Sequence, residues 1–314
     1  MQKVSIVIPC YNEEGNIEGI YKAVSEQMKK MKGYEYEILF IDNDSMDNSP
    51  RILRQLANAD MHVKVIMNIR NFGPERSGVH AFFQASGDAV ITLACDFQDP
   101  PELIPRFVGE WEKGAKVVWG QKRSSGESKW MWRIRATYYW IIKKFSPIRQ
   151  YSNVTGFGLY DRSVVSLMRS TQEMSPLFRN LVPELGFAPV CIEYDQPARK
   201  AGKSSYNFMR YFDTAMFSLV NTSRVPLHIA ALIGAVTAGI SFLFGAGYLV
   251  FKLLFWSRLP MGMAPVLIGM FFLGSVQIML VGLLGEYIGE VLTRVTHRPR
   301  VVEKERLNFC DDEN

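Results

Sequence analysis

Four short apolar runs recur in the first hundred residues, and a polar turn follows each of them. The runs lie at 4–8, 35–41, 63–67 and 90–94 and have the composition of buried strands. Helices are expected after the first three, one ending near residue 31 and two beginning near residues 48 and 74. Strands that alternate with helices in this way predict parallel βαβ units, and hence an α/β fold with a mostly parallel sheet.

The fourth run ends abruptly in polar residues. Cys95-Asp96-Phe97-Gln98-Asp99 follows it directly, and Pro100-Pro101 prevents the strand from continuing. Two carboxylates and a carboxamide thus come at the carboxyl end of a strand, where open α/β sheets bind their ligands. Hard oxygen ligands in this place suit Mg²⁺ or Mn²⁺ carrying a diphosphate. An acidic turn that only caps the next helix would have the same pattern.

Polar residues also follow the first two strands. Tyr11 and Glu13 lie in the first turn, after Pro9, and Asp42 ends the second strand, where it can accept hydrogen bonds from a nucleoside. The first turn has no glycine-rich dinucleotide fingerprint, and the chain has no P-loop. These absences disfavour a Rossmann oxidoreductase and a P-loop NTPase.

Several motifs resemble those of family 2 glycosyltransferases of the GT-A fold. They are IPCYNEE, the aspartate that ends the second strand, RNFG, DFQDPPE, the R-x-x-G-x-S-like loop at 199–204 and GEYIGE at 285–290. The chain is most similar to the polyprenyl-phosphate branch, which includes dolichol-phosphate mannose synthase and bactoprenol glucosyltransferase, and the resemblance covers nearly the whole chain. It implies inverting transfer of a sugar from a nucleotide-sugar, expected to be a UDP-sugar, to undecaprenyl or dolichyl phosphate.

The resemblance also implies roles for individual residues. The donor would be bound by residues from several loops, namely Pro9, Tyr11, Glu13, Asp42, Arg199 and Lys203. Asp96 and Gln98 match the positions that hold the metal in the family, so Mg²⁺ or Mn²⁺ is the expected cofactor. The expected catalytic residues are Asp96 together with Arg123 and Arg135, whose guanidinium groups suit an acceptor phosphate.

Two positions depart from the family pattern. Ala94 stands where relatives usually carry the first acid of D-x-D, and Gly156 stands where many relatives have the acid of G-D-F-R-L. We expect metal binding to persist with fewer anionic ligands. We also expect no carboxylate to act as a base, because a phosphate monoester is already largely dianionic at pH 7.

Two charge-free apolar runs, 229–251 and 264–285, are each long enough to span a ~30 Å hydrocarbon core. Basic residues lie on their outer flanks, whereas the link between them carries only Lys252 and Arg258. The positive-inside rule then predicts a two-span protein of the bacterial inner membrane with both termini in the cytoplasm. With a net charge of +5 and basic residues near these runs, membrane lipid is the expected partner and nucleic acid is not.

The expected domains are a catalytic domain at 1–224, a membrane domain at 225–292 and a basic-then-acidic tail at 293–314. The segment 129–145 is dense in Trp, Tyr, Arg and Lys and predicts an interfacial helix, with a core helix as the alternative. A second aromatic segment, 206–222, leads into the membrane. The four cysteines have no paired spacing, which indicates inert thiols in a reducing compartment.

Two other functions remain open at this stage. A processive polysaccharide synthase shares the fold, although such enzymes usually have more membrane spans and a Q-x-x-R-W motif that this chain lacks. A non-catalytic membrane scaffold is compatible with the loss of two family acids. The sequence names neither the sugar nor the lipid, and it leaves a homo-oligomer open.

Overall fold

The computed structural model describes residues 1–123, 151, 153–171, 177–197, 263–295 and 299–309, with isolated positions between 234 and 254. The chain divides into two compact units. The sheet unit comprises Met1–Lys143, Pro147–Ser205 and Arg298–Asn314, and the second unit comprises Lys144–Ser146 and Tyr206–His297.

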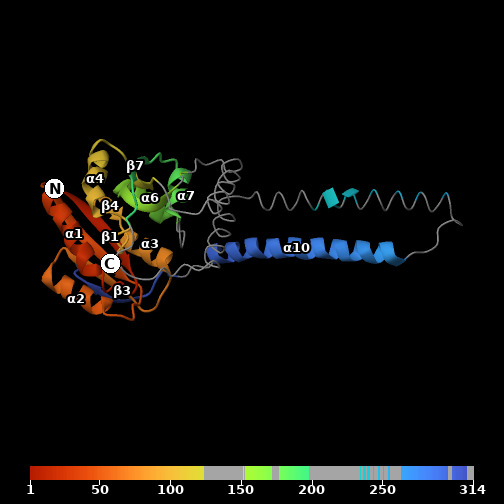
Figure 1. Ribbon diagram of the computed structural model, residues 1–314, viewed down its shortest axis with the longest axis horizontal. Coiled ribbons are helices and arrows are strands. Elements are labelled where there is room, and N and C mark those ends of the chain that lie inside the picture. Colours follow the sequence, from red (N-terminus) through yellow and green to blue (C-terminus); the bar gives the residue numbers. More distant parts are fainter. Residues whose placement is uncertain are drawn as a thin grey trace. The chain divides into compact units, whose positions relative to one another are not determined.

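An eight-stranded sheet is the centre of the sheet unit (Figure 1). Its strands in spatial order are β7 (Val190–Tyr194), β5 (Val117–Lys122), β6 (Val154–Asp161), β4 (Ala89–Thr92), β1 (Gln2–Cys10), β2 (Tyr34–Asp42), β3 (Val63–Asn68) and β8 (Glu303–Leu307). β6 and β8 run against the other strands. The predicted α/β fold with a mostly parallel sheet is therefore confirmed.

Helices cover both faces of the sheet. One apolar cluster contains the inward residues of α1 (Ile17–Lys30), α2 (Ser49–Ala59) and α4 (Ile104–Glu112). A short 3₁₀ turn, η1 (Pro101–Leu103), directly precedes α4. The other cluster contains those of α3 (Pro74–Gln84), α6 (Arg162–Ser170) and α7 (Phe178–Glu184). Because side chains of a strand alternate between faces, central strands covered on both sides are apolar throughout. This is why these strands could be predicted from largely apolar runs.

The predicted strands agree with β1 to β4 to within two residues at each end, and α2 and α3 begin within one residue of the predicted starts. Pro74 is the first residue of α3, as expected for a residue that needs no helical hydrogen bond there. It follows Gly73, whose φ of 89° lies in the region that glycine tolerates best.

The sequence indicates only a charged tail at 293–314, but the structure forms an edge strand from part of it. β8 pairs antiparallel with β3, and residues 298–314 belong to the sheet unit. The strand reads EKERL, which has almost none of the apolar character by which strands are predicted.

In the second unit the structure describes one long helix, α10 (Met263–Val295). It contains the segment Phe272–Gly289, which by length and hydropathy could cross a membrane and is the one such helix among the described residues. The second predicted span, 264–285, lies within α10. The first, 229–251, falls mostly outside the described residues, and the proposed interfacial helices at 129–145 and 206–222 fall entirely outside them.

Candidate functional site

The candidate site is built from loops at the carboxyl ends of β1, β2, β3 and β4, which meet at one edge of the sheet. Three of these loops contain a non-glycine residue with positive φ: Asn12 at 55°, Asp44 at 66° and Phe97 at 61°. Asn and Asp adopt this conformation at modest cost, but Phe does so rarely. Backbone strain of this kind is concentrated at binding and catalytic sites.

Asp96 lies in the loop after β4 and is only 5% exposed. Its Oδ1 accepts a hydrogen bond from the Gln98 backbone N–H at 3.1 Å, which closes the turn around Phe97. The structure thus brings the two predicted metal ligands into one tight turn, two residues apart.

Asp99 fixes the same loop from inside. Its Oδ2 accepts from the Ala94 backbone N–H, and its Oδ1 accepts from the Tyr194 hydroxyl, both at 3.1 Å. Burial raises the pKa of Asp99, although these donors and nearby Lys122 act in the opposite direction. Asp99 therefore holds the backbone at the position where relatives carry their first acid.

No motif in the sequence marks Lys122, but it belongs to this site. It ends β5, and its ammonium group lies close enough to Asp96 and Asp99 to interact electrostatically with both. Burial lowers the pKa of Lys122, and the two carboxylates oppose that change. The ammonium group therefore offsets part of the negative charge of the two carboxylates.

Asp42 lies on the other side of β1 and is 2% exposed. Its two oxygens accept hydrogen bonds from Ser45, at 2.5 Å from the hydroxyl and 3.1 Å from the backbone N–H. Burial raises the pKa of Asp42, and the bonds from Ser45 lower it. The Ser45 hydroxyl also accepts from the Asn12 backbone N–H at 2.8 Å, so the loops after β1 and β2 are joined.

Three asparagines connect the second and third loops. The Asn43 side-chain oxygen accepts from Asn68 Nδ2 and from the Phe72 backbone N–H, both at 3.0 Å. Asn43 Nδ2 donates to Asn71 Oδ1 at the same distance. This network explains the RNFG motif, because Asn71 and Phe72 orient the residue that follows Asp42.

The structure brings together most of the predicted site residues that it describes, at adjacent strand ends: Pro9, Tyr11, Glu13, Asp42, Asp96 and Gln98. Arg123 follows β5, with its side chain 60% exposed, and forms ion pairs with Glu193 at 3.2 Å and Asp195 at 3.5 Å. An acceptor phosphate there would have to compete with two carboxylates. Arg135, Arg199 and Lys203 lie outside the described residues.

The backbone explains why Gly156 carries no acid. Its φ is 99°, a region that favours glycine, so a side chain here would be strained although there is space for its Cβ. Its carbonyl oxygen accepts from the Thr92 hydroxyl at 2.6 Å and the Tyr160 hydroxyl at 2.8 Å. Both contacts depend on the position of this backbone.

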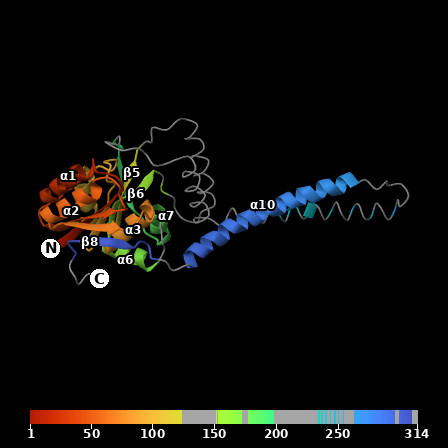
Figure 2. The same cartoon turned by 90° about the horizontal axis from the view of Figure 1, so that it is seen from below.

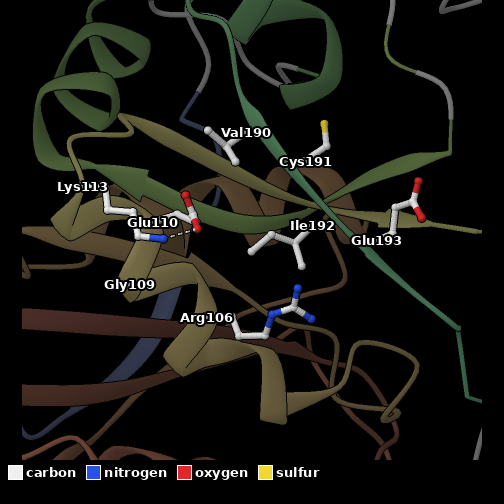
Figure 3. Close-up of a pocket in the computed structure, with 8 residues that line it drawn as sticks. All are labelled: Arg106, Gly109, Glu110, Lys113, Val190, Cys191, Ile192 and Glu193. Carbon is white, nitrogen blue, oxygen red and sulfur yellow. Dashed lines mark hydrogen bonds and ion pairs between the residues drawn. The ribbon is translucent and has the colours of Figure 1, made fainter.

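Two cavities lie near the site but do not contain it. One, of about 430 Å³, lies between α4 and β7 and is lined by Arg106, Glu110 and Glu193 among others (Figure 3). Another, of about 380 Å³, borders Phe97 and Pro100 on the side of α1. Neither is lined by Asp42 or Asp96.

Comparisons with known proteins show which proteins this chain is similar to. The family model described as Glycosyl transferase family 2 matches residues 5–167. A bactoprenol glucosyl transferase of Shigella phage SfV is 34% identical, over 96% of this chain and 98% of that protein. An undecaprenyl-phosphate 4-deoxy-4-formamido-L-arabinose transferase of Proteus mirabilis is 32% identical, over 96% and 92%. A glucosyl-3-phosphoglycerate synthase structure from Mycobacterium tuberculosis, 18% identical, has a TM-score of 0.47 over 64% of this chain and 72% of that one.

Proposed function

The chain belongs to glycosyl transferase family 2, and we propose from this that it transfers a sugar from a nucleotide-sugar to a polyprenyl phosphate. It is a glycosyltransferase with a GT-A α/β fold. The observation that carries the proposal is the placement of Asp42 at the end of β2 and Asp96 in the loop after β4, the two strands that flank β1. A nucleoside at Asp42 and its diphosphate at Asp96 would span adjacent loops of one sheet edge. The similarity to relatives named for bactoprenol and undecaprenyl phosphate supports the lipid acceptor.

We propose a UDP-sugar as the donor. Asp42 would accept hydrogen bonds from the base, while Tyr11, 43% exposed, and Glu13 shape the pocket beside it. Pro9 belongs to the same strand end. Arg199 and Lys203 are proposed to cover the phosphates, as the family resemblance implies.

Asp96 and Gln98 fit a divalent cation such as Mg²⁺ or Mn²⁺, because both offer hard oxygen ligands in one turn. The described part of the chain contains no group of three or more His, Cys, Asp or Glu suited to a metal, and Asp99 is engaged with Ala94 and Tyr194. The remaining ligands would therefore come from the diphosphate and water. When bound, the ion supplies Lewis-acid neutralisation of the leaving diphosphate, and Lys122 adds a positive charge beside it.

The acceptor is proposed to attack without a protein base. Its phosphate is already largely dianionic at pH 7, so it needs alignment rather than proton removal. Arg123 and Arg135 are proposed to provide that alignment. Asp161 is poorly placed to act as a base, because it pairs with Ala89 at the amino end of β4, away from the site.

Glu184, the last residue of α7, is the other acid to test. We expect Asp161→Asn and Glu184→Gln to lower the transfer rate by less than about tenfold, and by less than Arg123→Ala does. Asp161 accepts hydrogen bonds from Trp111, Lys116 and Ser163, so its loss should affect stability more than turnover. Initial rates at saturating donor, read beside melting temperatures, check this. A loss near 1,000-fold in a folded variant that still binds nucleotide would reveal a protein base.

α10 supports membrane attachment, and we propose two spans with the catalytic domain and both termini in the cytoplasm. The expectation follows from the basic flanks and from the few basic residues in the link. A tag at Asn314 should be accessible to a protease only after the inner membrane is permeabilised. Cleavage of that tag in cells with an opened outer membrane and an intact inner membrane would contradict this topology.

One experiment tests the function as a whole. Membranes containing the protein are incubated with a panel of labelled nucleotide-sugars and polyprenyl phosphate, and the lipid is then extracted. Label in the lipid fraction that depends on the protein is the expected result. Label in a long polysaccharide would instead indicate a processive synthase, and no turnover of any donor would favour a scaffold.

A further inference from the structure

The C-terminal strand β8 forms one edge of the sheet (Figure 2) and lies beside β3. β8 pairs with β3 up to Asn68, which lies opposite Glu303. Just beyond it, the Ile69 backbone N–H donates to the Val302 carbonyl at 3.0 Å. The C-terminal segment therefore reaches the carboxyl end of β3, where the loop containing RNFG begins.

A bulge lets this strand contact helices on both faces of the sheet. The register shifts between Met67 and Asn68, so that Glu305 lies opposite Met67 while Glu303 lies opposite Asn68. Glu303 and Glu305 are two positions apart in the strand, so without the shift their side chains would point to the same face of the sheet. With it, Glu303 contacts His80 of α3, and Glu305 contacts Arg54 of α2.

Both of these helices begin at donor loops. α2 follows the loop that starts at Asp42, and α3 follows the RNFG loop. Further anchors hold the segment in place: Asn308 Nδ2 donates to the carbonyls of Ala57 and Val63 at 2.7 and 2.8 Å.

Arg54 interacts both with Glu305 of the C-terminal strand and with Asp42, the carboxylate proposed to bind the nucleobase. Its Nη2 lies 2.7 Å from Glu305 Oε2, and its Nε lies 3.1 and 3.3 Å from the two oxygens of that carboxylate. Asp42 lies in the same row of the sheet, because it pairs with Met67 of β3, and Met67 pairs with Glu305 of β8. The charge of Asp42 also acts on Arg54. The guanidinium group is thus held by one carboxylate while it lies near another.

We propose that Glu305 is a positioning residue of the donor site, which holds Arg54 so that the Asp42 carboxylate stays available to the base. The inference rests on the proposed function, in which Asp42 binds the nucleoside. Without Glu305, the guanidinium group would be free to turn toward Asp42, the other carboxylate whose charge acts on it, because a charged donor seeks a carboxylate. An Arg54–Asp42 ion pair would compete with the nucleobase of the donor for the Asp42 carboxylate.

This proposal differs from mere protection of an exposed sheet edge, which β8 also provides. If β8 only protected the edge, its substitutions would lower stability, and removing both Arg54 and Glu305 would lower it at least as much as removing one of them. In the positioning role the second substitution repairs the first, because the competing guanidinium is gone. Lys304, an exposed residue of the same strand, offers a matched control.

The test uses the full chain in detergent and the variants Glu305→Ala, Arg54→Ala/Glu305→Ala and Lys304→Ala. We expect Glu305→Ala to raise the donor KM by about fivefold or more, with the acceptor KM unchanged. The double variant and Lys304→Ala should lie within about twofold of the original value, a difference below the coupling expected here. UDP affinity, measured by titration calorimetry, should follow the same pattern.

A double variant as impaired as Glu305→Ala would overturn the proposal, as would an unchanged donor KM in Glu305→Ala. If the unsubstituted chain transfers no sugar, the proposed function fails, but UDP affinity still decides the inference. Equal affinity in all variants, or no UDP binding at all, would then refute it.

Discussion

Replacing Asp96 with asparagine is expected to lower sugar transfer by on the order of 10²–10³-fold. The substitution removes an anionic ligand where a divalent cation would meet the diphosphate. It should leave the loop intact, because the asparagine oxygen can still accept from the Gln98 backbone N–H. The measurement is the initial rate of lipid labelling across a range of Mg²⁺ and Mn²⁺ concentrations. We expect the variant to need more metal to reach its reduced maximum.

Asp88→Asn is the matched control for this prediction. Asp88 precedes the same strand at its opposite end, where its carboxylate accepts from the Lys3 backbone N–H at 2.8 Å. Its replacement should leave the rate nearly unchanged. Near-normal transfer by Asp96→Asn, or by the unsubstituted protein in EDTA, would contradict the assignment of a metal to this loop.

The first half of the sheet was predictable because its strands are buried on both faces. Each of β1 to β4 contains an unbroken apolar run that only a sheet between two helical layers would need. Asp42 and Asp96 were predictable for the same reason, since each follows such a run. The remaining strands depend on distant partners: β8, for example, is stabilised by β3 rather than by its own composition.

The contacts that complete the site could not be predicted from spacing. Lys122 joins Asp96 and Asp99 only because β5 and β4 both border β6. The link from Glu305 to Arg54 crosses most of the chain length. Nothing local in the sequence marks either contact.

The cysteines show the same limitation. Their spacing indicated unpaired thiols, yet the register of β1 and β4, continued by three residues, places Cys10 opposite Cys95. Both thiols are buried and free. Burial raises the pKa of Cys10, and its neighbour Cys95 adds to the effect. The expectation of low reactivity is thus retained, although for a structural reason.

Glu37→Gln is expected to lower the free energy of unfolding of the sheet unit by about 3–5 kcal/mol. Glu37 is 2% exposed, and its carboxylate accepts hydrogen bonds from the side chain of Ser5 and from the backbone and side chain of Ser86. It also pairs with Lys3 at 2.9 Å and Lys64 at 3.2 Å. Removing its charge would leave the ammonium group of Lys64, 9% exposed, buried without its carboxylate.

The pH dependence follows from the same group. Burial alone would raise the pKa of Glu37, but hydrogen bonds from Ser5, Ser86 and Lys3, with the charge of Lys64, lower it from 4.5 to about 2. A depressed folded-state pKa contributes stability that is complete above pH 4.5 and is lost as the pH falls toward 2. The full contribution is about 3 kcal/mol. The unsubstituted protein should lose this increment on acidification, and Glu37→Gln should not.

Urea unfolding followed by tryptophan fluorescence measures the effect, since Trp111 and Trp119 are buried in the sheet unit. Glu35→Gln is the control, because Glu35 is exposed on the same strand and should change stability by less than about 0.5 kcal/mol. Glu37→Leu combined with Lys64→Met should recover much of the loss, since apolar replacement of a whole buried pair is often near neutral. Equal midpoints for Glu37→Gln and Glu35→Gln would show that the carboxylate contributes little. Such a result would mean that the hydrogen bonds and ion pairs around Glu37 only offset the cost of burying its charge.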